Sequence, residues 1–349
     1  MTTAPTTDPT TKPAPPPSMR LRELVFGAAC TAALRAAVRL GVPDALGDSP
    51  MSAADLAAAV KTEPKPLRRL LRALSCYGVF AEEPDGTFAH TGTSRLLRED
   101  DPHSLRAIAL WCTEPWTWAA WPKLDEAVRT NHNVVEDLFG KEFFTYLNED
   151  APESADVFNR AMTTSSRQSA QDVAEFLDLS GASSVADIGG GQGYVVASLL
   201  EKYPAMRGTL LDLPRVVDNA DPRLRPGGAL ADRVQIVPGD CRAEIPVQAD
   251  VYIIKNILEW DDVSTARTLR NVIEAGGPRA RVVVIENLVD DTPSMRFSTG
   301  MDLLLLLNVG GAKHTTESMV GRLTEAGLAV NDIRPVNPYL HAFDCTVAG

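Results

Sequence analysis

The chain has 349 residues, of which 44% are hydrophobic and 23% charged, and a formal net charge of -12. This length and composition are typical of a globular protein with room for two domains that each have a substantial core. The acidic excess argues against nucleic acid as the main partner, because phosphate binding depends on Lys and Arg. The five cysteines are scattered without a Cys-x-x-Cys pair, so neither a disulfide framework nor a metal site is expected.

Two segments bear on the location of the protein. Residues 1–19 are rich in Thr and Pro and lack an apolar core, so we expect a disordered tail rather than a signal peptide. The long apolar run at residues 301–309 contains Asp302 and is too short to cross a bilayer. We therefore expect a cytoplasmic protein without a membrane partner.

Residues 20–105 are expected to form a mainly helical winged-helix domain. The short apolar stretches 79–82 and 87–90 flank a Pro-Asp-Gly turn and predict a hairpin after the helices. Such a domain could read DNA through the arginines from Arg68 to Arg72, or it could assemble with a second copy of the chain. The acidic net charge favours assembly.

Residues 106–180 are expected to be linker helices rich in aromatic side chains. Tryptophan offers a large rigid apolar surface, so this segment could form a wall for a flat aromatic ligand. Packing in a core or at a dimer interface is the alternative. The candidate pocket residues here are Trp116, Phe144, Phe158, Asn159 and Met162.

Residues 185–194 read Val-Ala-Asp-Ile-Gly-Gly-Gly-Gln-Gly-Tyr and predict a strand, a tight turn and a helix. The glycines leave space for a ligand against the backbone, and the amides that open the helix are free donors. A dinucleotide fingerprint would need a third glycine at Tyr194, and no Gly-Lys-Ser/Thr follows. The spacing therefore indicates a nucleotide cofactor. It argues against a site for a pyrophosphate-containing dinucleotide and excludes a phosphate-binding loop of the Gly-Lys-Ser/Thr type.

Further apolar strands follow, and each ends in a polar residue: Asp212, Asp240 and Lys255. Ligands of open α/β sheets bind at the carboxyl ends of the strands, so these residues predict a cofactor crevice. We expect Asp212 to accept the ribose hydroxyls and Asp240 an adenine amino group. The full set of cofactor candidates is Asp187, Gly189, Gly191, Gly193, Asp212, Leu213, Asp240, Cys241 and Lys255.

The end of the chain supplies two more predicted strands, at residues 281–287 and 341–347, with a helix from 301 to 308 between them. Helical spacing turns several side chains of this helix to one side, and a buried charge on it needs a partner. The further candidates for the substrate pocket are Met301, Asp302, Leu305 and Asn308.

The ordered motifs resemble the cation-independent class I S-adenosylmethionine-dependent O-methyltransferases that act on plant phenols and on bacterial aromatic polyketides and antibiotics. The motifs are Asp-x-Gly-Gly-Gly-x-Gly from Asp187, Leu-Asp-Leu-Pro around Asp212, Gly-Asp at Asp240, Lys255, and Glu-Trp-Asp-Asp from Glu259. The resemblance covers nearly the whole chain after the tail.

This resemblance implies a Rossmann-like doubly wound α/β sheet in residues 181–349 and a homodimer whose winged-helix domains interlock. It also implies S-adenosylmethionine as methyl donor, S-adenosylhomocysteine as product, no metal, and a small aromatic substrate from polyketide or antibiotic biosynthesis. Two rivals remain open. One is a relative that binds the cofactor but decarboxylates or hydroxylates its substrate, and the other is a winged-helix regulator that senses a metabolite.

The base region departs from the family pattern, which has a histidine in Leu-His-x-Trp after the fourth strand. Here one residue is missing, and the histidine with it: alignment from Lys255 places Glu259 there, whereas alignment from the tryptophan places Leu258 there. Glu286 matches the second family acid, and Lys313 replaces the third.

A phenol with a pKa of about 10 needs help to lose its proton, and three mechanisms stay open. Glu259 could be the base with Glu286 orienting it, His314 could serve instead, or positioning alone could suffice for an already acidic hydroxyl. The catalytic candidates are therefore Glu259, Glu286 and His314.

Overall fold

The computed structural model describes residues 16–290, 292–293 and 295–348. The chain divides into two compact units, Met1–Thr113 and Glu114–Gly349. Residues 1–15 of the expected tail lie outside the described residues, and the first helix already begins at Pro17. The expected linker of residues 106–180 is split between the units, because its first residues belong to the N-terminal unit.

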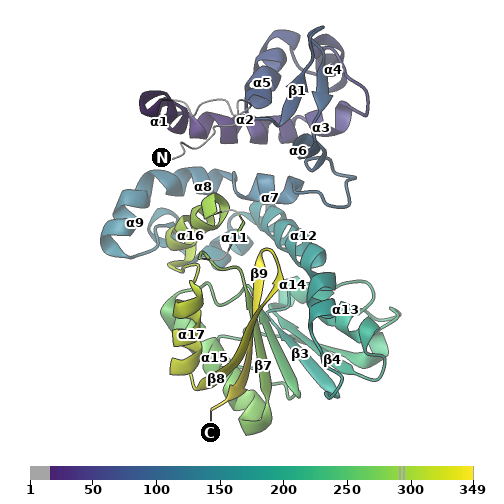
Figure 1. Cartoon of the computed structure of the whole chain (residues 1–349), viewed down its shortest axis with the longest axis vertical. Coiled ribbons are helices and arrows are strands. Elements are labelled where there is room, and N and C mark those ends of the chain that lie inside the picture. The colour runs from purple at the N-terminus through teal and green to yellow at the C-terminus, as the bar shows by residue number, and fades with distance from the viewer. Residues whose placement is uncertain (1–15, 291, 294, 349) are drawn as a thin grey trace, which may run out of the picture. The chain divides into compact units, whose positions relative to one another are not determined.

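The N-terminal unit consists of helices and one hairpin (Figure 1). Strands β1 and β2 pair antiparallel from Phe80 opposite His90 to Glu82 opposite Phe88, as the sequence predicts. Helix α5 turns its buried Leu67, Leu71 and Leu74 to the core of this unit. Its elements are α1 (Pro17–Val25), α2 (Gly27–Arg39), α3 (Val42–Ala45), α4 (Ala53–Ala59), α5 (Pro64–Cys76), β1 (Phe80–Glu82), β2 (Phe88–His90), α6 (Gly92–Arg95) and α7 (Arg106–Trp111).

Two of the three arginines of α5 bind the hairpin. Arg72 donates from Nε and Nη2 to the carboxylate of Glu82, at 2.9 and 2.7 Å. Arg68 reaches the same carboxylate at 3.5 Å. These charges therefore stabilise the contact between helix and hairpin.

The C-terminal unit begins with helices and continues as a sheet with helices on both faces. The helices are α8 (Pro115–Ala120), η1 (Trp121–Lys123), α9 (Leu124–Thr130), α10 (Val135–Phe139), α11 (Phe143–Glu149), α12 (Pro152–Phe176), α13 (Tyr194–Lys202), α14 (Pro214–Val217), η2 (Ala231–Arg233), α15 (Asp262–Gly276), η3 (Gly277–Arg279), α16 (Met295–Val309) and α17 (Thr316–Glu325). The strands are β3 (Ser184–Ile188), β4 (Arg207–Asp212), β5 (Val234–Pro238), β6 (Val251–Lys255), β7 (Arg281–Glu286), β8 (Leu328–Asn337) and β9 (Leu340–Val347).

The sheet has seven strands in the order β5-β4-β3-β6-β7-β9-β8. Strands β3 to β7 run parallel, and β9 pairs antiparallel with both β7 and β8. The strand order reverses direction beside β3, which is where open α/β sheets bind their ligands. Asp212 and Lys255, as well as the loop after Ile188, lie at the carboxyl ends of these strands.

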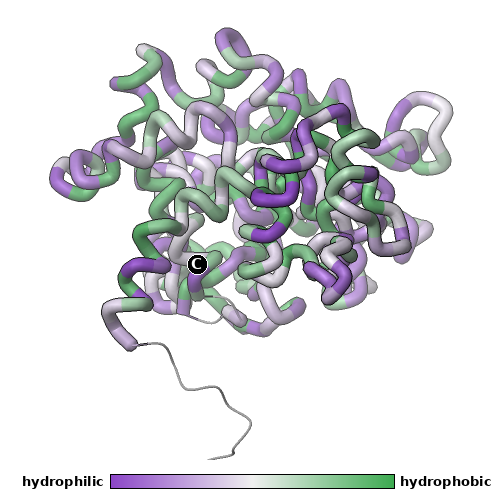
Figure 2. Tube along the Cα trace, turned by 90° about the horizontal axis from the view of Figure 1, so that it is seen from above, coloured by the Kyte–Doolittle hydropathy of each residue, from purple (hydrophilic) through white to green (hydrophobic). Residues whose placement is uncertain are grey.

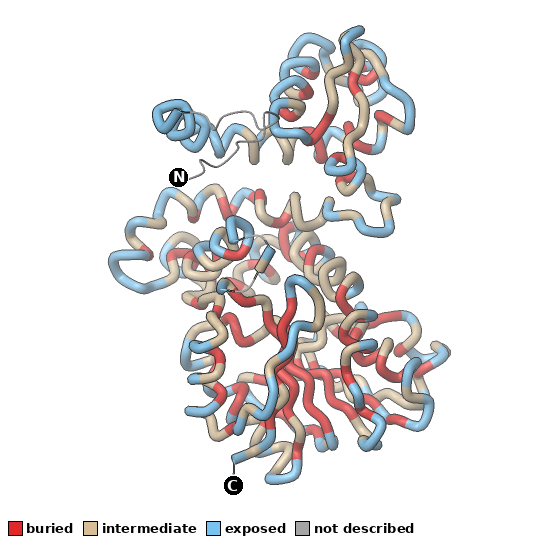
Figure 3. The backbone as a smooth tube through the Cα atoms, in the orientation of Figure 1, coloured by how far each residue is buried: buried red, intermediate tan, exposed pale blue. Residues whose placement is uncertain are grey.

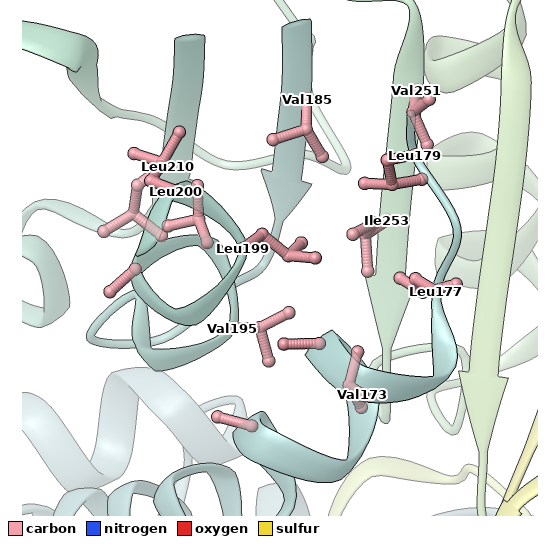
Figure 4. Packing of buried hydrophobic residues seen from close by; sticks show 14 of the residues in the cluster. Val173, Leu177, Leu179, Val185, Val195, Leu199, Leu200, Leu210, Val251 and Ile253 are labelled. Carbon is pink, nitrogen blue, oxygen red and sulfur yellow. The ribbon is translucent and has the colours of Figure 1, made fainter. Parts of the chain in front are cut away.

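Apolar side chains bury both faces of the sheet. On one face, residues of α12 and α13 such as Val173 and Leu199 pack on β3 and β6 (Figure 4). On the other face, Leu269 of α15 and Met319 of α17 pack on the opposite side chains of the same strands. The middle of the sheet is buried throughout (Figure 3). The site at the strand ends therefore rests on a rigid base.

Hydrophilic and hydrophobic residues alternate at short intervals along the trace (Figure 2). None of the described helices is both long and apolar enough to cross a membrane. In the same described part of the chain, no three His, Cys, Asp or Glu side chains gather in a way that could hold a metal ion.

Candidate active site

The glycine loop between β3 and α13 has two sides. Gly191 has φ 63°, and a Cβ on it would meet nothing within 4 Å, so this side of the loop is open. Gly193 has φ 83°, and a Cβ there would lie 2.5 Å from Leu224 Cδ1. The amide of Gly189 donates to the Leu211 carbonyl at 2.8 Å, which ties the loop to β4. The loop therefore packs closely on the sheet and leaves backbone accessible on its other side.

Asp212, at the end of β4, fixes this loop. Its Oδ2 accepts from the Gly191 amide at 2.7 Å, and its Oδ1 accepts from the Leu213 amide at 2.7 Å. Burial raises the pKa of Asp212 to about 6, against the effect of these hydrogen bonds. A carboxylate in this state gains from further donors, such as a pair of ribose hydroxyls.

This carboxylate predicts a pH-dependent cofactor affinity. Protonation of Asp212 in the free protein competes with hydrogen-bond donors to its oxygens. The affinity for S-adenosylhomocysteine should therefore be constant above about pH 7. Below about pH 6 it should fall, by up to about tenfold per pH unit. Asp212→Asn should bind more weakly, by roughly 1–3 kcal/mol, and lose this slope. Calorimetric titrations across this range test both points, and an equal slope in the variant would contradict the assignment.

Asp187 and Lys255 lie on the paired central strands β3 and β6. Asp187 is 1% exposed and accepts from the Val196 amide at 3.3 Å. Burial raises the pKa of Asp187 to about 7, while the positive charge of Lys255 opposes this shift. Burial likewise lowers the pKa of Lys255, and Asp187 is the carboxylate that opposes it most. The two residues thus balance each other's buried charge.

Asp240, after β5, has a partner that the sequence did not indicate. Arg242 donates from Nε and Nη2 to this carboxylate at 2.9 to 3.1 Å, and its guanidinium lies 5.4 Å from the centre of the Trp260 ring. Partial burial raises the pKa of Asp240, but the bonds from Arg242 outweigh it and the net shift is downward. Cys241 is buried beside them and accepts on its carbonyl from Asn271 at 2.8 Å.

The turn after β6 brings the acidic candidates together. Glu259 is buried and forms an ion pair with Lys313, whose Nζ contacts Oε1. Glu286, at the end of β7, accepts on Oε1 from the Leu258 amide at 3.1 Å. Its Oε2 has no donor among the described residues, and the Glu286 carboxyl lies close enough to interact with that of Glu259. Burial, and then the charge of Glu259, raise the pKa of Glu286 well above its usual range.

His314 lies beside the same turn, with both ring nitrogens engaged. Its Nε2 is 2.8 Å from the Leu258 carbonyl, which makes Nε2 the donor, and its Nδ1 is 3.4 Å from Ser318 Oγ. Burial lowers the pKa of His314, so the ring is neutral near pH 7. The structure therefore places His314 next to Glu259 as a support of the turn.

Asn256 is a further residue that the sequence did not single out. It directly follows Lys255 with φ 54°, and its buried Oδ1 has no partner among the described residues. A non-glycine residue in the left-handed region is strained, and such residues often mark functional sites. The signal in the sequence was only an Asn after a buried strand.

Four of the nine predicted substrate residues line two separate cavities. One, of about 220 Å³, is lined by Asn159 and Met162 of α12 and by Gly191 of the glycine loop. The other, of about 350 Å³, is lined by Phe144 and Asn308. Asn308 is buried, and its Oδ1 has no partner in the described part of the chain.

The other five candidates line neither cavity. Trp116 is buried edge-on against Phe143, with ring centres 4.9 Å apart, and Phe158 packs at 6.0 Å from Phe144. Met301, Asp302 and Leu305 are partly buried on α16. Asp302 accepts from the Lys313 amide at 2.7 Å.

Family models match two parts of the chain. Residues 121–329 match the O-methyltransferase domain, and residues 22–100 match the O-methyltransferase dimerisation domain. The chain belongs to the O-methyltransferase family. It is an S-adenosylmethionine-dependent O-methyltransferase, with the class I fold that its motifs predict.

Its relatives include enzymes of antibiotic biosynthesis. The mitomycin biosynthesis 6-O-methyltransferase of Streptomyces lavendulae is 39% identical over 317 residues, which are 90% of each chain. The structure of the mitomycin 7-O-methyltransferase MmcR has a TM-score of 0.85 at 38% identity and covers 95% of this chain and 98% of its own. The O-methyltransferase NcsB1, in complex with S-adenosylmethionine and 2-hydroxy-5-methyl naphthoic acid, has a TM-score of 0.79 at 28% identity and covers 94% of this chain and 98% of its own.

The residues of this O-methyltransferase fit its cofactor. The open side of Gly191 gives room for the methionine and ribose portions against the backbone, and Asp212 offers a carboxylate beside it. A phosphate-free cofactor needs no cluster of positive charge, and Lys255 is already balanced by Asp187.

Proposed function

We propose that this O-methyltransferase methylates a hydroxyl group on a small aromatic natural product, with Glu259 taking the hydroxyl proton. The observation that supports the proposal is the pair formed by Glu259, in the turn after β6, and Glu286, at the end of β7, whose pKa is raised by burial and by Glu259. With the alignment taken from Lys255, this pair stands where the family has a histidine and an acid.

When bound, S-adenosylmethionine supplies a methyl group on a positively charged sulfur and is left as S-adenosylhomocysteine. The proton of the attacking hydroxyl becomes acidic as the new carbon–oxygen bond forms, so a carboxylate is a strong enough base at that moment. Glu259 accepts this proton. Glu286, which is neutral, donates its own hydrogen to Glu259 and aims the second carboxylate oxygen into the site.

The geometry supports Glu259 over His314 for this role. His314 donates its Nε2 hydrogen to the Leu258 carbonyl, and its other nitrogen faces Ser318. Its lowered pKa makes it a poor proton acceptor. We assign it to holding the backbone of the residue before Glu259.

The cavity beside Phe144 and Asn308 is the proposed substrate pocket. The aromatic cluster of Trp116, Phe143, Phe144 and Phe158 suits a flat ring. The unpartnered Oδ1 of Asn308 would accept a hydrogen bond from a polar group of the substrate. The naphthoic acid in the complex of NcsB1 is a compound of this class.

The N-terminal unit is the proposed dimer interface, in a cytoplasmic homodimer. Leu21, Leu24 and Val25 of α1 are 63%, 59% and 71% exposed, and a second copy would cover them. Sedimentation should then give twice the chain mass of 37.6 kDa, and a monomer would contradict the proposal. We assign no role to a metal or to nucleic acid, so activity should survive a chelator.

The function is tested with a panel of hydroxylated benzoates, naphthoates, phenazines and quinones, each incubated with S-adenosylmethionine. Mass spectrometry should find an acceptor that gains one methyl group in step with release of S-adenosylhomocysteine. A product that instead loses carbon dioxide or gains oxygen, without a methyl group, would favour the decarboxylase or hydroxylase alternative.

A further inference from the structure

The ion pair between Lys313 and Glu259 is buried, with side chains 7% and 12% exposed. Two charges in such a place lose their hydration, and their attraction often only compensates for this loss. A buried pair is therefore weak evidence of a purely stabilising role. Because one member of the pair is the proposed base, Lys313 acts directly on the charge of Glu259.

The loop after α16 fixes the position of Lys313. Asp302 accepts from the Lys313 amide at 2.7 Å. Two residues before Lys313, Gly311 packs so closely on the Glu259 backbone that a Cβ on it would lie 1.8 Å from the Glu259 carbonyl oxygen. One residue after Lys313, His314 bonds the Leu258 carbonyl. The ammonium is thus held against Glu259 by its own loop.

The charged groups around Glu259 come from three elements. Glu286 lies on β7, Lys255 on β6, and Lys313 and His314 on the loop after α16. Lys255 is drawn first to Asp187, and His314 is neutral. Lys313 is therefore the cation that pairs with Glu259.

Two carboxyl groups that face each other out of water cannot both be ionised, and they titrate as a pair that shares a proton. A positive charge next to one of them decides which one loses its proton. Lys313 contacts Glu259 directly, whereas Glu286 Oε1 is bonded to a backbone amide. The two carboxyl groups therefore have different neighbours, and only Glu259 has a cation in direct contact.

We propose that Lys313 is a positioning residue that keeps Glu259 ionised and leaves the shared proton on Glu286. The proposal rests on the assignment of Glu259 as the base, and it gives a purpose to a lysine in the place of a family acid. Lys313 and Glu286 together would fix the orientation and the protonation state of Glu259, as neighbouring groups do for a catalytic histidine.

The first test reads carboxyl protonation by infrared spectroscopy and needs no methyl acceptor. Lys313→Met removes the charge, and the pH below which the protonated carboxyl band of Glu259 appears should rise by roughly 1–3 units relative to the wild type. The double variant with Glu259→Gln assigns that band by losing it. Lys313→Arg should stay close to the wild type. An unchanged midpoint in Lys313→Met would overturn the proposal.

Folding is checked by calorimetry with S-adenosylhomocysteine, since Lys313 lies outside the glycine loop and Asp212. Lys313→Gln keeps a hydrogen-bond donor without the charge, and it replaces the methionine variant if that variant does not bind. The same upward shift is expected in it, and its absence would equally overturn the proposal.

The second test is the pH profile of kcat/KM with the acceptor found in the panel. Lys313→Met should move the acidic limb upward by the same roughly 1–3 units, so that activity returns at high pH. A purely structural role would lower activity equally at every pH. Unchanged turnover in Glu259→Gln would remove Glu259 as the base, while the infrared result would still decide what Lys313 does.

Discussion

Replacement of Glu259 by glutamine is expected to lower kcat by roughly 10²–10⁴-fold, the range that a positioned general base contributes. Glutamine has nearly the same shape and can still contact Lys313, but it cannot take a proton. Affinity for S-adenosylhomocysteine should be unchanged, because Asp212 and the glycine loop are untouched. Initial rates at saturating acceptor and cofactor measure the effect.

The matched variant is Glu286→Gln, since Glu286 already acts as a neutral group. An amide there can accept from the Leu258 amide and donate to Glu259, so kcat should fall by less than about tenfold. Glu325→Gln, on the exposed side of α17, controls for the loss of a negative charge and should leave turnover unchanged. Equal losses in Glu259→Gln and Glu286→Gln would contradict the assignment of their roles.

The substitution Gly311→Ala should lower kcat by roughly 10²-fold, through displacement of the turn that carries Glu259. The new Cβ would lie 1.8 Å from the Glu259 carbonyl oxygen and 2.8 Å from the adjoining carbonyl carbon, so the backbone of one segment has to move. A shift of about 1 Å in a catalytic group is enough for a loss of this size. Steady-state kinetics gives the loss, and calorimetry should find the cofactor affinity retained.

Gly300→Ala is the control, because a Cβ on this glycine of α16 would meet nothing within 4 Å. It should have wild-type kcat and, as an alanine in a helix, no loss of stability. If Gly311→Ala had the kcat of the wild type, the close packing of the Gly311 loop on the turn after β6 would not be what positions Glu259.

The sequence alone predicted the strands whose ends carry the cofactor candidates. Each of Asp187, Asp212 and Lys255 ends an apolar run, and parallel strands bring such ends to one edge. The glycine spacing before Tyr194 then separated this site from a dinucleotide site. These signals are local, so they could be read along the chain.

Contacts between distant loops could not be read in this way. Lys313 and Glu259 are far apart in the chain, and their pairing depends on how the loop after α16 packs on the turn after β6. Strand β8 was also not predicted, because it is an edge strand whose apolar residues do not alternate regularly with its polar ones. The bond from Arg242 to Asp240 joins residues close in the chain, but it depends on the conformation of the turn, which the sequence pattern did not indicate.

The central claim is that this site transfers a methyl group to oxygen with a carboxylate as base. The most direct measurement uses S-adenosylmethionine labelled with carbon-13 in its methyl group, with wild-type protein and Glu259→Gln in parallel, and reads the product by NMR. The account predicts a labelled methyl on an aromatic oxygen, formed by the wild type and strongly slowed in the variant. A label on nitrogen, no label in the product, or equal rates in the two proteins would contradict it.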